Sequence, residues 1–222
     1  GVMHFTKILA GVEMNKGRVT RSDVVKACQK GIVNAQKQYA EMAGEPMWYG
    51  PEYFITTHIA QSLNKAAGSK FITLENSAYY GLQDANALGK GTLHSDLRSN
   101  GRFDILLWWA NELPRAVIEV KNRVYNKTQY ESDIKRIKQT LERKSESSSL
   151  EFGVFSFYTL AYDSEIKENS GKQTLESRLS TIESRISDMV GANFNIEMAR
   201  HIKYCDVGEV YWAAASVIIT RA

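Results

Sequence analysis

Gly101-Arg-Phe-Asp-Ile-Leu-Leu-Trp-Trp-Ala110 is followed within a few residues by Ala116-Val-Ile-Glu-Val-Lys-Asn-Arg-Val124, and these two segments decide the fold. Both are rich in β-branched and aromatic residues, which predicts two strands. The residues between them, Asn111-Glu-Leu-Pro-Arg115, combine a turn-favouring Asn with a Pro that cannot donate a ladder hydrogen bond. The pattern therefore predicts a tight antiparallel hairpin.

Three charged residues, Asp104, Glu119 and Lys121, interrupt the apolar pattern of these strands. Because side chains alternate along a strand, Glu119 and Lys121 project from one face and Val120 from the other. If the turn centres on residues 112–113, paired positions sum to 225, which places residue 104 opposite residue 121. Asp104 then lies within reach of both other charges. Burying unpaired charge is costly, so the trio needs a compensating partner, and a divalent cation is the obvious candidate.

An Asp at the head of one strand and Glu-x-Lys on the next resembles the signature of the PD-(D/E)xK nuclease superfamily. Phe103 stands where the motif has Pro. The resemblance implies a restriction-endonuclease-like core, which is a mixed α/β (α+β) fold with a central mixed β-sheet flanked by helices. In that core the trio lies on the second and third strands. The order of predicted elements agrees with it from about residue 51 to residue 160.

The resemblance also implies a reaction, the metal-dependent hydrolysis of phosphodiester bonds in nucleic acid, with DNA favoured over RNA and endonuclease action favoured over exonuclease action. Asp104 and Glu119, with the Val120 carbonyl, would hold Mg²⁺ or Mn²⁺, because both ions prefer hard oxygen ligands. Lys121 would orient the attacking water or stabilise the transition state.

The superfamily tends to place a further carboxylate on the helix before the first core strand, and Glu52 is the match here. The alternative interpretation of Glu52 is a first-turn acid that complements the helix dipole. Glu75, inside the predicted first core strand, is the rival candidate.

Basic residues gather after the second strand of the hairpin. Between Lys121 and Lys144 there are eight basic and three acidic residues, a local charge of +5 against +3 for the whole chain. Such clusters bind phosphate backbones, although a solvated helix face is the alternative. The predicted nucleic-acid-binding residues are Arg102, Asn122, Arg123, Lys127, Lys135 and Lys138.

The whole chain is predicted to run helix, helix, three strands, helix, strand, helix and two strands. These elements are expected at about 22–42, 51–67, 71–80, the two segments above, 130–144, 152–160, 174–190, 196–205 and 210–220. Residues 1–50 are expected to form an N-terminal helical segment packed on the core. Residues 51–222 are expected to form the nuclease-like core of what is overall one globular domain.

Two further segments have alternative interpretations. The polar stretch 81–100, with His94, Asp96 and Arg98, is predicted to be a long loop, with mobility in the absence of ligand and contact with substrate as the two interpretations. The apolar stripe of the helix at 174–190 is predicted to pack on the sheet, with a homodimer interface as the alternative. It comprises Leu175, Leu179, Ile182, Ile186 and Met189.

The amino-acid composition restricts the possible kinds of site and the possible cellular location. The 222 residues include two cysteines, Cys28 and Cys205, too far apart in sequence to suggest a disulfide framework or a thiolate metal site. The absence of an apolar run of about 18 residues predicts no membrane partner and a cytoplasmic protein. Besides the nuclease, two alternatives stay open at this point. They are a catalytically inactive nucleic-acid-binding protein on the same fold and a protein-interaction module from a defence or phage context.

Overall fold

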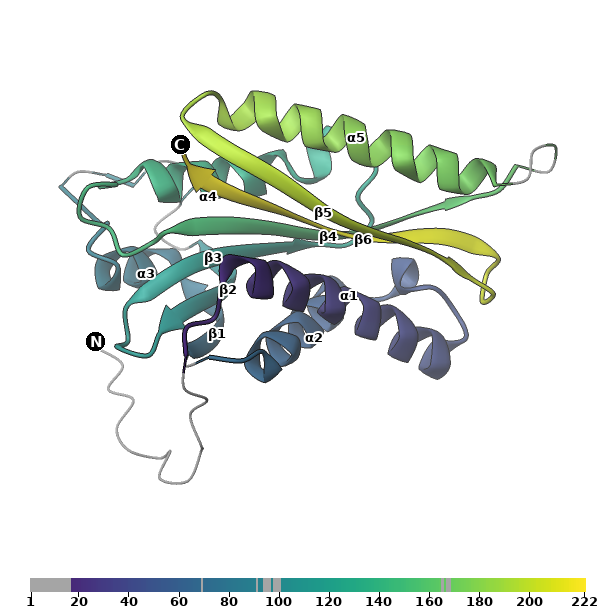
Figure 1. The fold of residues 1–222 in the computed structure, drawn as a ribbon, viewed down its shortest axis with the longest axis horizontal. Helices are drawn as coiled ribbons and strands as arrows, with labels where there is room; N and C mark the ends of the chain where they lie inside the picture. The colour runs from purple at the N-terminus through teal and green to yellow at the C-terminus, as the bar shows by residue number, and fades with distance from the viewer. Residues whose placement is uncertain are drawn as a thin grey trace, which may run out of the picture.

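The computed structural model of the chain describes residues 17–68, 70–90, 92–93, 97, 101–164, 166 and 169–222 (Figure 1). Its elements follow in the predicted order, with one additional helix, α3, and two short 3₁₀ helices. They are α1 (Arg21–Ala43), η1 (Met47–Tyr49), α2 (Glu52–Lys65), β1 (Lys70–Ser77), α3 (Ala78–Asp84), β2 (Arg102–Trp109), β3 (Pro114–Lys121), η2 (Lys127–Gln129), α4 (Glu131–Glu142), β4 (Phe152–Tyr162), α5 (Ser170–Val190), β5 (Phe194–Cys205) and β6 (Val210–Arg221).

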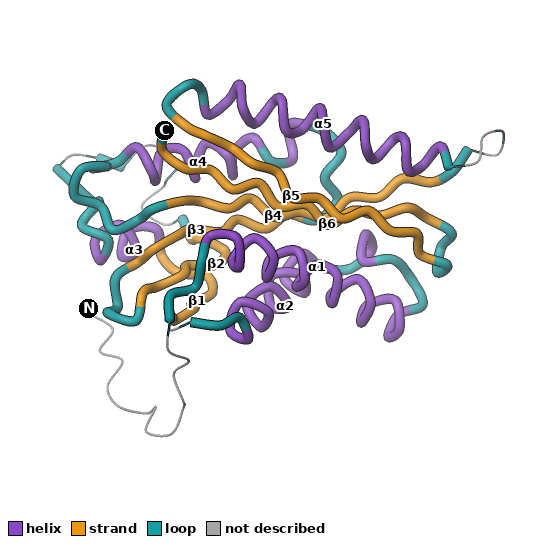
Figure 2. The backbone as a smooth tube through the Cα atoms, in the orientation of Figure 1, coloured by secondary structure: helices purple, strands orange, loops and turns teal. Residues whose placement is uncertain are grey.

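The strands form one six-stranded sheet in the order β1-β2-β3-β4-β6-β5. Among the strands described, β3 and β4 pair in parallel and the other neighbours are antiparallel. A parallel pair needs a crossover connection, and α4 provides it. The predicted mixed α/β architecture, with a central mixed sheet flanked by helices, is therefore confirmed (Figure 2). No helix in the described ranges is long and apolar enough to cross a membrane.

The sheet is covered on both faces (Figure 1). On one face, α1 and α2 enclose a core with the side chains of Ile105, Ile118 and Val120. Gly31 lets these two helices touch, because a Cβ there would overlap the backbone of Ile59 on α2. The sheet is thus held between two apolar layers, one on each side.

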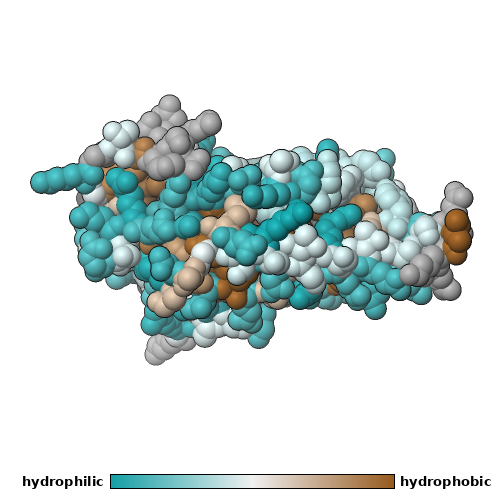
Figure 3. All heavy atoms as spheres, turned by 90° about the horizontal axis from the view of Figure 1, so that it is seen from above, coloured by the Kyte–Doolittle hydropathy of each residue, from teal (hydrophilic) through white to brown (hydrophobic). Residues whose placement is uncertain are grey.

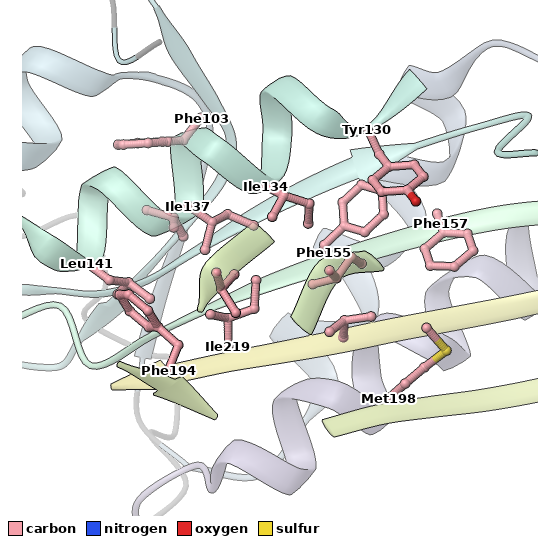
Figure 4. Close-up of a cluster of buried hydrophobic side chains, with 14 of the residues drawn as sticks. Phe103, Tyr130, Ile134, Ile137, Leu141, Phe155, Phe157, Phe194, Met198 and Ile219 are labelled. Carbon is pink, nitrogen blue, oxygen red and sulfur yellow. The ribbon is translucent and has the colours of Figure 1, made fainter. Parts of the chain in front are cut away.

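The second core lies between the opposite face of the sheet and the helices α3, α4 and α5. Figure 4 shows part of it, with Ile134 and Ile137 of α4 close to Phe155 of β4. Gly153 of β4 allows α4 to lie this close, because a Cβ at that position would overlap the side chain of Ile137. A single missing methyl group therefore sets the distance between α4 and the sheet.

The predicted register of the hairpin is wrong by two positions. Ile105 pairs with Ile118, so paired positions sum to 223, and continuing the ladder places Asp104 opposite Glu119 rather than Lys121. The cause is local: Glu112 adopts a left-handed φ of 65° in the turn, and a bulge interrupts the ladder between Leu107 and Trp108. Neither feature has a signal in the sequence, because Glu is not a residue that favours positive φ.

Two other predictions are settled in part. The stretch expected to be a long loop begins inside α3, and its residues His94, Asp96 and Arg98 lie outside the described residues. The apolar stripe of α5 packs on the sheet as predicted, since four of its members are buried in the second core and Met189 packs against it. The stripe is consequently not available as a dimer interface, and homodimerisation by another surface stays a prediction.

Candidate active site

The two strands that carry the trio separate where the charged residues begin. The β2–β3 ladder extends no further than the pair Ile105–Ile118. Beyond it, the Val120 amide donates a hydrogen bond of 2.7 Å to Asp104 Oδ2 in place of a ladder bond. On its other side, β3 pairs in parallel with β4 as far as Lys121. The charged residues thus lie at the carboxyl end of a parallel strand, where open α/β sheets usually bind ligands.

Glu119 has no exposed surface at all. Arg136 of α4 reaches it from above the sheet, with Nη1 3.1 Å from Glu119 Oε2 and also donating to the backbone oxygen of Arg102. The second carboxylate oxygen, Oε1, has no hydrogen-bond partner among the described residues. Burial, and next the charge of Asp104, raises the pKa of Glu119 well above its usual value, although Arg136 opposes the shift.

Lys121 is held between two carboxylates from opposite faces of the sheet. Its Nζ lies 3.3 Å from Glu52 Oε1 of α2 and 3.5 Å from Asp133 Oδ2 of α4. The other oxygen of Glu52 accepts a hydrogen bond of 2.9 Å from the Asn122 amide. Burial by itself would lower the pKa of Lys121, but the charges of Asp133 and Glu52 outweigh it and raise the pKa. The ammonium group is therefore kept in its charged form.

These contacts distinguish the two predicted auxiliary carboxylates. Glu52 joins the trio through Lys121 and the neighbouring amide. Glu75 is exposed on β1 with φ of 52°, and within the described ranges no hydrogen bond or ion pair connects it to the trio. The geometry therefore places Glu52 at the site and Glu75 outside it.

Two members of the site, Asp133 and Arg136 of α4, were not predicted from the sequence, in which they belong to a charged helix face. Both are largely covered, with 6% and 23% of their side chains exposed. A signal for them exists: positions 133, 136, 137 and 140 follow helical spacing, and 137 and 140 are buried. Polar residues on the inward face of an amphipathic helix are candidates for contact with a buried charge.

Six ionisable side chains thus meet at this end of the sheet, and we call them the acidic cluster. They are Glu52, Asp104, Glu119, Lys121, Asp133 and Arg136. Four acids and two bases give a charge of −2 when all six are ionised. Burial raises the pKa of Asp104 to about 6, against the opposing effects of the Val120 amide and Lys121. When all six groups are ionised the cluster has more negative charge than its own cations neutralise, and burial together with this excess raises the pKa of Glu119 and Asp104.

The donor set suits a hard divalent cation. In the described part of the chain, no three His, Cys, Asp or Glu side chains are grouped so as to hold a metal ion. Mg²⁺, however, often takes only one or two carboxylates from the protein and keeps several waters. Asp104 and the unpaired Oε1 of Glu119 are such a pair. Val120 directs its amide to Asp104, and in an extended strand the N–H and C=O of one residue point to the same side, so its carbonyl also faces β2. The ligands that the site offers a divalent cation are therefore two carboxylates and one backbone carbonyl.

Part of the predicted nucleic-acid-binding set has a structural role instead. Asn122 is buried, and its amide nitrogen donates to the carbonyls of Met47 and Gly50 over 3.0 and 2.9 Å. Arg123 donates from Nε to the carbonyl of Trp48 over 2.6 Å. These bonds fasten the turn after β3 to the segment before α2, and they place Glu52 next to Lys121. Asn122 is consequently not available to a ligand, which corrects its predicted role.

The remaining basic residues of that set lie on the surface of the protein. Lys127 and Lys135 both pair with Glu131, at 3.7 and 3.0 Å. Lys138 donates to the carbonyl of Met189 over 3.2 Å. Arg102 is exposed at the start of β2. Exposed pairs of this kind are weak and exchange readily with phosphate, so the binding role of these four residues stays a prediction.

A comparison of the chain with family models, curated proteins and solved structures gives no match. The functional assignment therefore depends on the chemistry of the acidic cluster and on the arrangement of the elements that form it.

Replacing Asn122 with Ala should lower the free energy of unfolding by about 2–3 kcal/mol, because two buried carbonyls lose their donor. Urea unfolding measures the change. Asn64→Ala, at an exposed position of α2, is the matched control and should change stability by less than about 0.5 kcal/mol. An equal effect of both substitutions would show that Asn122 does not fasten the turn.

Removing Arg136 should destabilise the protein, because it leaves the buried Glu119 without its cation. We expect Arg136→Gln to cost about 2–4 kcal/mol, and Arg136→Gln combined with Glu119→Gln to cost clearly less than the sum of the single changes. A double-mutant cycle by urea unfolding in EDTA measures this coupling. Strict additivity would contradict a direct pairing of the two side chains.

Asp104→Asn should stabilise the metal-free protein at neutral pH. Because the folded carboxyl has a pKa of about 6, above its unfolded value, the folded state binds its proton more tightly and loses stability as pH rises through 6. The gain should be about 3 kcal/mol at pH 7.5 and fall toward zero below about pH 4. Urea unfolding in EDTA at several pH values tests this, and a gain independent of pH would refute it.

Proposed function

We propose that this protein is a metal-dependent nuclease with a restriction-endonuclease-like core of the PD-(D/E)xK type, acting on DNA. The order of the elements supports the proposal. Helix α2 precedes three strands that pair as β1-β2-β3, and the crossover α4 then leads to β4 in parallel with β3. This is the order that the superfamily resemblance implies, with Asp104 on the second strand and Glu119 and Lys121 on the third.

The observation that carries the proposal is the uncompensated negative charge of the acidic cluster. Glu119 is fully buried with one oxygen unpaired among the described residues, and Asp104 lies beside it, bound to the next amide of β3. A purely structural cluster would pair each buried charge, since an uncompensated one costs several kcal/mol. Uncompensated buried charge is typical of sites that bind ligands or perform catalysis.

In this proposal Asp104, Glu119 and the Val120 carbonyl hold Mg²⁺ or Mn²⁺. An ion held there would supply a water molecule of lowered pKa and would offset the charge of the phosphate. Asp104 and Glu119 fix the position of the ion because both are held by the strands, one through the Val120 amide and the other by burial.

Lys121 acts as a cation in this proposal and not as a general base. Its pKa is raised, so at neutral pH it has no lone pair to accept a proton from water. Its ammonium group orients the attacking water and stabilises the negative charge that develops on the phosphate in the transition state. Glu52 and Asp133 position that ammonium group from two sides, and Arg136 supplies a second fixed positive charge.

A second function, binding of nucleic acid without cleavage, is favoured by one specific observation. Arg136 already occupies one oxygen of Glu119, so part of the carboxylate pair is neutralised by the protein itself. If that ion pair persists in the presence of divalent cations, the cluster would remain a structural one and the basic surface alone would act.

We expect the protein to cut supercoiled plasmid or single-stranded DNA with Mg²⁺ or Mn²⁺ and not with EDTA. Asp104→Asn and Lys121→Met should each reduce the cleavage rate by about 100-fold or more, because each removes a group that acts in the transition state. Lys37→Ala, a substitution of an exposed lysine on α1, is the matched control and should cut like the wild type.

Isothermal titration of Mn²⁺ separates the two functions. The nuclease requires a saturable site that is lost in Asp104→Asn, whereas the binding protein requires no metal site. Absence of cleavage and of Mn²⁺ binding, in a protein that still binds DNA, would replace the first function with the second.

A further inference from the structure

A polar groove lies between α5 and the segment that leads away from the acidic cluster at the end of β3. Its volume is about 580 Å³. One wall is the row of hydroxyl-bearing residues on α5, at the helical spacing of four, three and four: Ser170, Thr174, Ser177 and Thr181. Tyr125 stands at the other wall, four residues beyond Lys121. Figure 3 looks down on this side of the molecule and shows a mostly hydrophilic surface. We call this hollow the α5 groove.

The charge of the α5 groove is positive. Arg178 and Arg185, two turns apart on α5, line it, and none of its described lining residues is acidic. Arg178 is held against β4, since its Nη1 donates to Thr159 Oγ1 and to the carbonyl of Leu160, both over 2.7 Å. Arg185 is exposed. Guanidinium groups and hydroxyl groups together are the donors that proteins direct at phosphate oxygens.

Tyr125 adds an aromatic surface to these donors. Its side chain is 54% exposed, and its ring lies 6.1 Å from that of Trp48, measured between centroids. The pair is fixed to the residues that follow Lys121, because Arg123 binds the carbonyl of Trp48 and Asn122 binds the carbonyls of Met47 and Gly50. An exposed ring beside phosphate donors is the arrangement that stacks an unpaired base while its backbone is bound.

We propose that the α5 groove binds a single-stranded segment of nucleic acid that leaves the acidic cluster. One base stacks on Tyr125, and successive phosphates of the strand are held along α5 by Arg185 and by the hydroxyl row. In a duplex, neighbouring bases cover each other's faces, so the ring of Tyr125 has nothing to stack on; a single strand presents the faces of its bases. The inference rests on the proposed nuclease function and adds its substrate class, a strand with unpaired nucleotides beside the cleavage point.

Fluorescence anisotropy in EDTA, where cleavage does not occur, tests the proposal with fluorescein-labelled (dT)15, (rU)15 and a 15-base-pair duplex. Tyr125→Ala should weaken binding of (dT)15 at least about 5-fold and binding of the duplex by less than 2-fold. Tyr125→Phe keeps the ring and should bind like the wild type. Arg185→Ala should lower the slope of log K against log salt by about 0.7. The ratio of (dT)15 to (rU)15 affinity shows which single strand is preferred.

Tyr80→Ala is the matched control, since Tyr80 on α3 is 50% exposed and packs edge-on against Tyr79, outside the lining of the α5 groove. It should bind (dT)15 like the wild type. Equal losses for Tyr80→Ala and Tyr125→Ala, or unchanged binding in Tyr125→Ala and Arg185→Ala, would overturn the proposal.

The binding assay also separates this proposal from the proposed function. If the wild type cuts DNA with Mn²⁺ while the groove variants bind (dT)15 normally, the nuclease stands and the groove assignment fails. If the groove variants lose (dT)15 while the wild type never cuts, the groove assignment stands as a single-strand-binding site and the nuclease fails.

Discussion

The site is organised around the free-energy cost of keeping a carboxylate in a place without solvent. Glu119 lies near the end of β3 and is buried. The neighbouring elements place charged and polar groups around it. The crossover helix directs Arg136 at one of its oxygens, and β2 ends its ladder so that Asp104 binds the next amide. Because Arg136 compensates only part of the negative charge of the carboxylates, the cluster must either bind a cation or take up a proton.

The topology explains why these groups meet. A parallel pair of strands requires a crossover, and the crossover helix begins above the carboxyl end of the first strand. Helix α4 thereby supplies two residues, Asp133 to Lys121 and Arg136 to Glu119. Helix α2 reaches Lys121 from the opposite face through Glu52. Residues from both layers therefore converge only at the point where β2 and β3 separate.

The sequence was sufficient for the parts of this arrangement that depend on local periodicity. Strand alternation correctly placed Glu119 and Lys121 on one face, and the order of helices and strands was correct except for α3. It was insufficient where a residue adopts a backbone conformation that its type does not favour, and where a contact is non-local. The positive φ of Glu112 changed the register by two positions, and no pattern within α4 specifies that Arg136 will meet Glu119. Asn122 was predicted to bind nucleic acid because its actual partners, the carbonyls of Met47 and Gly50, lie 75 and 72 positions earlier in the chain.

Gly153 controls the electrostatics of a site that it does not touch. Its missing side chain lets Ile137 approach β4, and Ile137 follows Arg136 directly on α4. The height of the helix above the sheet therefore determines how close a guanidinium group comes to a carboxylate at the neighbouring strand. Packing and charge are mechanically linked through α4, so a steric change beneath the helix would alter ionisation at the cluster without replacing any charged residue.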